Sequence, residues 1–471
     1  NVSNNGNITG TSGNGTGTTV SGNLSGTGQV SGSAQGSGAG IDINGTVNGG
    51  HLHGQSSEGT GAHVGNGSNL TDGTVSGNST NGSGAVIDGN VSNNGNITGT
   101  SDNGTGAVVS GNLSGTGEVS GSTQGAGSGV DITGSVEGGA IRGDSAHGTG
   151  TTVSNGSNVT NTTIGGNSST GTGVEWGSQV THDNVTISGN ATSGTGVHLG
   201  DDTTLNNATV SGNTADGTGV SISGNLTSAG STTVSGNSTG TGSGVDLSGN
   251  VTGGSITGNA TGTGSGVSVS GSDSTASNTS ISGNTANGTG VSISGNLTSA
   301  GSTTVSGNAT GSGSGVHLNN GTVTGGLVQG DAHDGAGIKV SGNGTINHAT
   351  VNGTTTNGSG FLVDGTLSQS PDSIVNGAVR PGGTGEAVTR VTPPAEQGRA
   401  QMMSQVSRQQ QVTSEMGREA IRPQAGYQPA PAPVEMQLCD GDSCQSLTLD
   451  AHKASPSSPL STSVTSPVNR P

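Results

Sequence analysis

A repeat of about 23 residues constrains the fold of this chain more than any other feature. Glycine turns of the form GTG, GSG or GAG recur sixteen times, and a three-residue start such as TTV, IDI or VSI follows each of them. The third residue of each start is aliphatic or, once, tryptophan: Val20, Ile43, Val64, Ile87, Val109, Ile132, Val153, Trp176, Leu199, Ile222, Leu247, Val269, Ile293, Leu318, Val340 and Val363. The steps between them run from 21 to 25 residues. A repeat of this period is typical of solenoid proteins, in which each copy forms one coil and stacks on its neighbours.

Each repeat has the pattern of short β-strands. In the copy that begins at Val220, the apolar residues Val220, Ile222, Leu226 and Val234 alternate locally with Ser and Thr, as in a half-buried sheet. β-Branched residues dominate, and SGN and NGS triplets between the strands supply residues that tolerate positive φ. Three short strands with tight corners make one coil of a parallel β-helix. We therefore predict an all-β fold, a right-handed parallel β-helix of about 16 coils that covers residues 1–379.

The composition by itself favours a different class, a disordered low-complexity linker. The chain contains 98 glycines and only three aromatic residues, and low hydrophobicity with a net charge of −18 is typical of disorder. Whole-coil duplications favour the solenoid instead. The segment from Asn1 recurs from Asn90, and the segment from Val220 recurs from Val291, so the offsets of 89 and 71 residues equal four and three coils. Aliphatic residues also keep their phase through copies that have diverged.

The composition changes after the repeats. We divide the rest of the chain into an irregular linker at 380–393, a helix at 394–422 that would cap the last coil, a Pro-rich linker at 423–434, a cysteine-loop segment at 435–450 and a disordered tail at 451–471. The only two cysteines are Cys439 and Cys444, and an Asp-Gly pair between them can turn the chain. This spacing favours a small disulfide loop in an oxidising compartment over half of a zinc site or a redox pair.

Negative charge is concentrated in the repeat region. Residues 1–379 hold 20 acidic side chains and two basic ones, Arg142 and Lys339, whereas residues 380–471 hold eight of each sign. Nucleic acids and anionic membranes are bound through clusters of Lys and Arg, so we expect neither as a partner. No apolar run approaches the roughly 18 residues of a membrane helix, so we also expect no membrane span.

The residues do not suggest an enzyme or a cofactor site. β-Helix enzymes that cleave polysaccharides need clustered carboxylates, whereas the one adjacent acid pair, Asp201 and Asp202, would face opposite sides of a strand. His51 and His53 lie two apart in GGHLHG and are able to face the same way, but no third ligand is suggested, which favours exposed polar positions. Asp246 directly precedes an aliphatic residue, unlike the aspartates of calcium-binding repeats. We predict no catalytic residue, no bound metal and no cofactor.

The degenerate coils rich in Gly, Asn, Ser and Thr and the closely spaced cysteine pair resemble one family in particular. This is the family of large adhesins exported by two-partner secretion, which includes filamentous haemagglutinin and the high-molecular-weight adhesins. The resemblance implies that an outer-membrane two-partner transporter exports the protein and that a Cys439–Cys444 loop holds the C-terminus there, although 27 residues follow Cys444 here. Because Asn1 aligns with Asn90, inside a coil, we expect the chain to be the C-terminal part of a longer protein.

Asn-X-Ser/Thr triplets occur about thirty times between Asn1 and Asn357 and nowhere after Asn357. One interpretation is corner chemistry, since Asn and Gly suit tight turns. The other is glycosylation of exposed corners, for which the resemblance implies a dedicated N-glycosyltransferase as a partner. The candidate acceptors are Asn7, Asn14, Asn23, Asn44, Asn96, Asn103, Asn112, Asn225, Asn296 and Asn308.

Together these features favour a secreted bacterial surface adhesin stalk that attaches to a receptor on host cells or on other bacteria. We expect it to be extracellular or tethered at the outer-membrane surface, and not to be an enzyme. The alternative is a passenger or spacer of an autotransporter-type surface protein.

Overall fold

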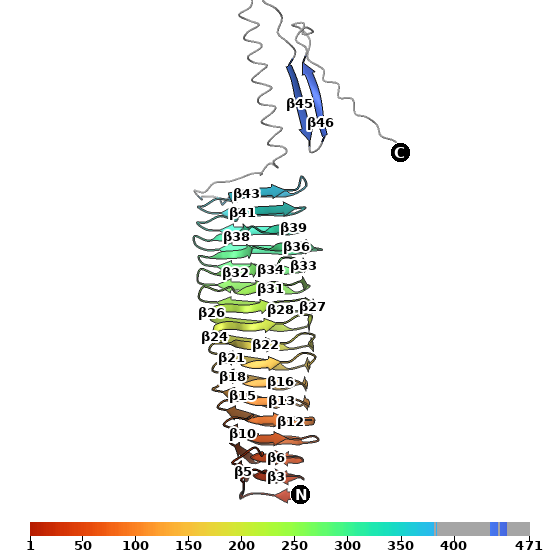
Figure 1. Cartoon of the computed structure of the whole chain (residues 1–471), viewed down its shortest axis with the longest axis vertical. Helices are drawn as coiled ribbons and strands as arrows, with labels where there is room; N and C mark the ends of the chain where they lie inside the picture. Colours follow the sequence, from red (N-terminus) through yellow and green to blue (C-terminus); the bar gives the residue numbers. More distant parts are fainter. Residues whose placement is uncertain (381–382, 384–433, 441–442, 450–471) are drawn as a thin grey trace, which may run out of the picture. The chain divides into compact units, whose positions relative to one another are not determined.

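The computed structural model describes residues 1–380 and 383 and, in a second unit, residues 434–440 and 443–449. The first unit is a parallel β-solenoid of about sixteen turns, in which each strand pairs in parallel with its equivalents one coil before and one coil after (Figure 1). The described residues contain strands and no helix. The predictions of an all-β fold and of parallel coils are therefore confirmed, while the right-handed sense of coiling stays a prediction.

Each coil contributes three strands to three parallel stacks. The first stack follows the glycine turns and contains β3 (Thr18–Val20), β6 (Ile41–Ile43), β9 (Ala62–Val64), β11 (Ala85–Ile87), β13 (Ala107–Val109), β16 (Val130–Ile132), β19 (Thr151–Val153), β22 (Thr172–Trp176), β29 (Val245–Leu247), β32 (Ser265–Val269), β35 (Thr289–Ile293) and β38 (Ser314–Asn319). The second contains β1 (Val2–Ser3), β4 (Leu24–Ser25), β7 (Thr46–Asn48), β14 (Asn112–Ser114), β17 (Ser135–Glu137), β20 (Asn158–Thr160), β23 (Thr181–Asp183), β25 (Thr203–Asn206), β27 (Leu226–Ala229), β30 (Val251–Thr252), β33 (Ser274–Ser277), β36 (Asn296–Ala300) and β39 (Thr322–Thr324).

The third stack has six-residue strands: β2 (Asn7–Ser12), β5 (Gln29–Ala34), β8 (His51–Ser56), β15 (Glu118–Thr123), β18 (Ala140–Ser145), β21 (Thr163–Ser168), β28 (Thr233–Ser238), β31 (Ser255–Ala260), β34 (Ser280–Thr285), β37 (Thr304–Ala309), β40 (Leu327–Ala332), β42 (Thr350–Thr355) and β44 (Ile374–Val379). Six longer strands run through a corner and belong to two stacks: β10 (Asn69–Ser79), β12 (Asn90–Ser101), β24 (Thr186–Leu199), β26 (Thr209–Ile222), β41 (Ile338–Asn347) and β43 (Phe361–Gln369). The last coil thus ends with an ordinary third strand, β44, where the repeat fades in the sequence.

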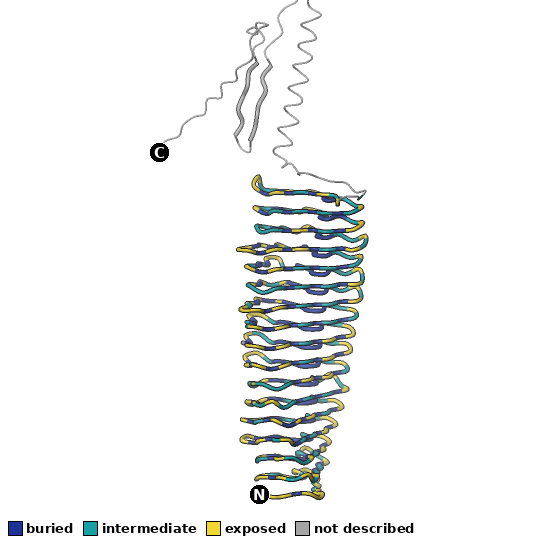
Figure 2. The backbone as a smooth tube through the Cα atoms, turned by 180° about the vertical axis from the view of Figure 1, so that it is seen from behind, coloured by how far each residue is buried: buried dark blue, intermediate teal, exposed yellow. Residues whose placement is uncertain are grey.

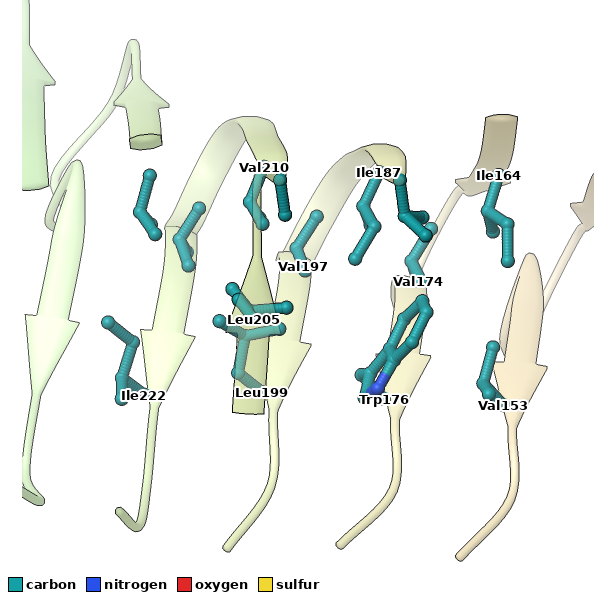
Figure 3. Packing of buried hydrophobic residues seen from close by; sticks show 14 of the residues in the cluster. Val153, Ile164, Val174, Trp176, Ile187, Val197, Leu199, Leu205, Val210 and Ile222 are labelled. Atoms are coloured by element: carbon teal, nitrogen blue, oxygen red, sulfur yellow. The ribbon is translucent and has the colours of Figure 1, made fainter. Parts of the chain in front are cut away.

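The core consists of aliphatic columns that run through the coils. In the repeat from Val220, the residues Val220, Ile222, Leu226 and Val234 are at most 2% exposed, as their alternation with Ser and Thr predicts. The sixteen residues that define the repeat are likewise buried from Ile43 to Val340, while Val20 and Val363 in the terminal coils are not. Equivalent side chains stack directly, as Figure 3 shows for Val153, Trp176 and Leu199. Stacking buries these side chains in every inner coil, and the burial of each one stabilises the fold by about 1.5–3 kcal/mol.

Glycine has two distinct roles, and the sequence interpretation was right for only one of them. At corners, Gly67 and Gly156 of two NGS triplets adopt φ values of 80° and 76°, and Gly138, between a second and a third strand, has a φ of 83°. The glycines of SGN and GGN triplets in the third stack, however, lie inside strands. A Cβ on Gly166 would lie 2.0 Å from the Gly173 carbonyl oxygen, and one on Gly189 would lie 1.9 Å from that of Gly196. These glycines are required because the backbone of the turn before the first strand packs directly against them.

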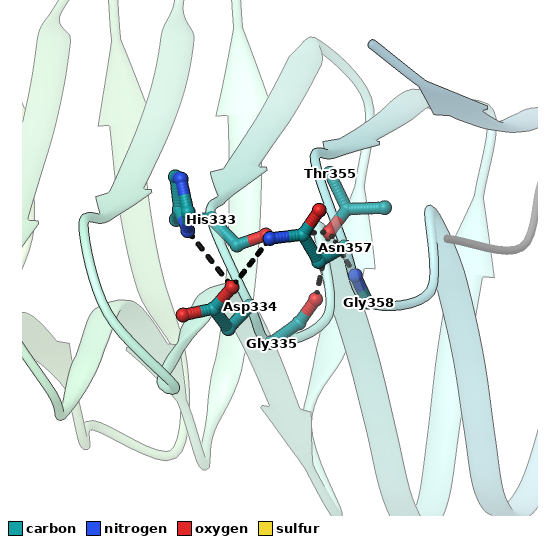
Figure 4. A network of polar contacts seen from close by, with 6 residues as sticks. All are labelled: His333, Asp334, Gly335, Thr355, Asn357 and Gly358. Carbon is teal, nitrogen blue, oxygen red and sulfur yellow. Dashed lines mark hydrogen bonds and ion pairs between the residues drawn. The ribbon is translucent and has the colours of Figure 1, made fainter. Parts of the chain in front are cut away.

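Buried hydroxyl groups hold the glycine turns of successive coils together. The Thr355 hydroxyl donates to the Gly335 carbonyl of the preceding coil at 2.9 Å and accepts from the Gly358 N–H of its own coil at 3.0 Å (Figure 4). The same pair of bonds is made by Ser56, Ser79, Ser101, Ser145, Ser168 and Thr285. The Gly358 N–H and the Gly335 carbonyl make no backbone hydrogen bond within the described coils, so this hydroxyl satisfies one donor and one acceptor at once.

In the second unit, β45 (Val434–Asp440) and β46 (Ser443–Leu449) pair antiparallel with Cys439 directly opposite Cys444. The helix predicted at 394–422 and the tail at 451–471 lie outside the described residues. So do nearly all of the linker at 380–393 and all of the Pro-rich linker at 423–434 except its last residue. Within the described part of the chain, no helix has the length and hydropathy needed to span a membrane.

Candidate functional site: the outer surface of the solenoid

The lateral surface of the solenoid is polar. Burial alternates along most strands of the inner coils, and exposed residues are concentrated at the corners (Figure 2). Among the described residues, the large hydrophobic side chains that are exposed lie only in the first and last coils: Val2, Ile8, Leu362, Val363 and Ile374. Contacts on the sides of the solenoid must therefore be made by polar groups, mainly hydroxyls, amides and carboxylates with a few imidazole and basic side chains.

An asparagine ladder is the longest ordered feature of this surface. It runs along the third stack, where each side-chain amide nitrogen donates to the side-chain oxygen of the preceding coil at 2.6–2.9 Å. Its members are Asp144, Asn167, Asn190, Asn213, Asn237, Asn259 and Asn284. The ladder begins at an aspartate because a carboxylate only accepts hydrogen bonds and can end such a row. Each amide keeps a second N–H and a second lone pair for a ligand or for water.

Shorter ladders follow the same rule at the corners. Asn103 donates to Asn81, which donates to Glu58, at 2.9 and 3.0 Å. Asn250 donates to Asn225, which donates to Asp202, at 2.8 and 2.9 Å. Sequence reasoning missed these ladders, although the recurrence of Asn at one phase of each repeat is a signal that would have found them.

A shallow groove of about 470 Å³ crosses four coils beside the start of the long ladder. It lies where the third strand meets its corner in β15, β18, β21 and β24, and it is lined by the polar or small residues Ser122, Thr123, Gln124, Asp144, Ser145, Ala146, Asn167, Ser168, Ser169, Asn190, Ala191 and Thr192. Asp144 is the only charged group in this lining. The groove therefore suits a neutral, hydroxyl-rich or amide-rich ligand better than an anion or a lipid.

The ion pairs among the described residues are few and isolated from one another. Arg142 Nε lies 3.0 Å from a Glu118 carboxylate oxygen, and His63 Nδ1 lies 2.7 Å from Asp42. Asp202 occupies a turn with a φ of 54° and caps an asparagine ladder.

The pKa shifts among these groups have local causes. Burial raises the pKa of Glu175, and the nearby His198 opposes this in part. The hydrogen bonds from Asn357 and His333 lower the pKa of the exposed Asp334 carboxyl.

His182 interrupts the aliphatic column of the second stack. It is 1% exposed and stacks between Val159 and Leu205. Its ring meets Trp176 edge-on, with ring centroids 4.0 Å apart. Neither ring nitrogen has a hydrogen-bond partner of normal geometry among the described residues. Burial lowers the pKa of His182 to about 3, although the Val159 backbone opposes the shift, so the ring is neutral inside the solenoid.

The ten candidate acceptor asparagines separate into two groups. The amide nitrogens of Asn44, Asn103, Asn112, Asn225 and Asn296 already donate to Asp or Asn side chains at 2.8–3.3 Å. For the amides of Asn7, Asn14, Asn23, Asn96 and Asn308, no hydrogen bond is present within the described residues. The first four of these are exposed and Asn308 is half-buried.

The sequence analysis also singled out a pair of histidines and a pair of cysteines, and each pair lies within regular β-structure. His51 and His53 lie on the same outward face of β8. Cys439 and Cys444 are opposite each other in the β45–β46 pair, and opposed residues have Cα atoms about 4.5–5.5 Å apart, within the range that a disulfide spans. The disulfide itself stays a prediction. Among the described residues, no three His, Cys, Asp or Glu side chains gather in a way that could hold a metal ion.

The chain matches no protein-family model and no curated protein.

Proposed function

We propose that this chain is the stalk of a secreted bacterial surface adhesin and that its coils contact a receptor on host cells or on other bacteria. The observation that carries the proposal is the repeated, ordered polar surface, in particular the asparagine ladder and the groove beside it. A ladder of amides at the coil spacing of about 4.8 Å offers the same donor and acceptor pattern many times. Such a surface supports multivalent attachment, in which weak contacts add along an extended ligand.

Export by an outer-membrane two-partner transporter belongs to the same proposal. It rests on the resemblance to two-partner adhesins, and the Cys439–Cys444 pair would serve as the anchoring loop. The opposed backbone positions of the two cysteines support a closed loop at this point of the chain.

Glycosylation by an N-glycosyltransferase is the remaining part of the proposal. Asn7, Asn14, Asn23 and Asn96 are the best placed acceptors, because they are exposed and their amides make no hydrogen bond within the described coils. Asparagines in ladders, such as Asn103, would have to carry the sugar beside an existing bond. Peptide mapping of the native protein should therefore find glycans first at the unbonded group. An intact mass equal to that of the bare chain would remove this part of the proposal.

The internal duplication allows a sharp test of the adhesin function. Deletion of residues 220–290 removes three coils and places Val291 where Val220 stood, so the repeat continues without a break. The coils lost shorten the solenoid by about 14 Å. The purified full chain, applied as a soluble competitor, should bind target cells saturably and block attachment of cells that display it.

A matched pair of variants distinguishes adhesion from spacing. The 220–290 deletion leaves the groove at residues 122–192 intact, whereas Asn167→Ala and Asn190→Ala remove two of its ladder amides. The deletion also removes Asn237, Asn259 and Asn284 from the ladder. If the groove is the main contact, the deletion should keep most of the soluble competition, and the double substitution should weaken it more. A passive spacer predicts that the soluble chain never competes and that attachment of displaying cells depends only on the length of the displayed solenoid. That outcome would refute the proposal.

A further inference from the structure

The two histidines of β8 lie on one exposed face of the third stack. His51 and His53 alternate with the buried residue Leu52, so both side chains project from the same face of the third stack. Two residues apart on a strand, their Cα atoms are separated by about 6.6 Å. Two imidazoles at this separation are able to reach a single ion through nitrogen bonds of about 2.0–2.1 Å.

Both rings are oriented by hydroxyl groups of the next coil. His51 Nδ1 lies 2.6 Å from the Thr74 hydroxyl, and His53 Nδ1 lies 2.7 Å from the Ser76 hydroxyl. The Ser76 hydroxyl in turn donates to the Leu52 carbonyl at 3.4 Å. In the tautomer that carries its proton on Nδ1, each imidazole donates to its hydroxyl partner, and the lone pair lies on Nε2. Histidine ligands of metals typically donate their other ring N–H to a partner of this kind.

We propose that His51 and His53 form a two-histidine chelate for a divalent transition metal such as Ni²⁺, Zn²⁺ or Cu²⁺, bound through the two Nε2 atoms. Imidazole nitrogen favours these ions over the harder Ca²⁺ and Mg²⁺. The protein supplies two ligands, and water or a group from a second molecule completes the coordination sphere. The acidic solenoid attracts cations to its surface and so assists binding. This site is independent of the receptor that the adhesin proposal invokes.

Neighbouring coils provide conservative replacements for the test. Thr74 and Ser76 occupy the positions of His51 and His53 in the next coil, so His51→Thr and His53→Ser keep residues that this stack already accommodates. The probe is NiCl₂, titrated calorimetrically into the untagged full chain at pH 7.5 in a buffer that does not chelate metal. Each single variant should weaken binding at least tenfold, and the double variant should abolish it. His147→Asn, which removes an exposed histidine of another coil, should bind as the natural chain does.

Ser76→Ala tests the orienting hydroxyl. It should lower Ni²⁺ affinity by about 10- to 100-fold without touching either ligand. Circular dichroism and the unfolding midpoint of every variant check that the solenoid is intact. One ion per chain, or one ion per two chains, supports the proposal if binding is lost in the double variant. Absence of binding by the natural chain, or binding that the double variant retains, overturns it.

Discussion

The buried His182 should make the solenoid less stable in mild acid. Its pKa is lowered to about 3 inside the coil from an ordinary value of 6.5. Between these two values the unfolded chain binds a proton on this ring and the folded chain does not, so the free energy of unfolding falls as the pH falls. Each pH unit costs at most about 1.4 kcal/mol, and the total loss approaches about 5 kcal/mol at pH 3. Above pH 6.5 the ring is neutral in both states and adds no pH dependence.

The variant His182→Leu isolates this effect. Leu205 occupies the same column one coil later, so a leucine suits the site. Between pH 7 and pH 4, the free energy of unfolding of the natural chain should fall by about 3 kcal/mol more than that of the variant. Urea unfolding followed by circular dichroism measures both. Burial also raises the pKa of Asp131 and Glu175, but both chains share these carboxyls and the comparison cancels them. His147→Asn serves as the exposed control. Parallel pH profiles for His182→Leu and the natural chain would refute a buried, neutral ring.

Three further predictions concern packing, corners and the cysteines. Gly166→Ala should destabilise the solenoid by about 3 kcal/mol or more, because the new Cβ would lie 2.0 Å from a backbone oxygen. The neighbouring Gly165→Ala is the control. Its Cβ would have no atom nearer than 3.9 Å, so this variant should stabilise the solenoid by about 0.5–1 kcal/mol. Thermal unfolding of the two variants compares them, and equal midpoints would contradict the close approach. Ser101→Ala should cost about 1–3 kcal/mol in urea unfolding, since it leaves one backbone donor and one acceptor of two turns without their partner. Thiol titration of protein purified under oxidising conditions should detect no free Cys439 or Cys444 until reductant is added, and two free thiols would exclude the loop.

The interior of the solenoid could be predicted from the sequence because its pattern is local. An aliphatic residue two positions from another on a strand faces the same side whatever the rest of the fold does. This is why Val220, Ile222, Leu226 and Val234 could be assigned to the core, and why the number of coils followed from the recurrence of the glycine turns.

The outer surface could not be predicted in the same way. Its ladders join residues that are 22 to 25 positions apart, and the coils vary in length, so only the stacking register decides which asparagines meet. The sequence likewise does not distinguish a glycine at a corner from one inside a strand. Gly138 and Gly166 look alike in a glycine-rich repeat, yet one needs a positive φ and the other needs space for a backbone carbonyl.

For the candidate sites too, the sequence determined local features and the tertiary structure determined the contacts between coils. The sequence alone determined that His51 and His53 lie two apart and that Cys439 and Cys444 flank a turn. The tertiary structure decided that the histidines are oriented by hydroxyls of the next coil and that His182 replaces an aliphatic residue in a core column. The physical reason is that the backbone geometry of a strand sets the alternation of its side chains, whereas hydrogen bonds between coils depend on the register in which each coil stacks on the one before it.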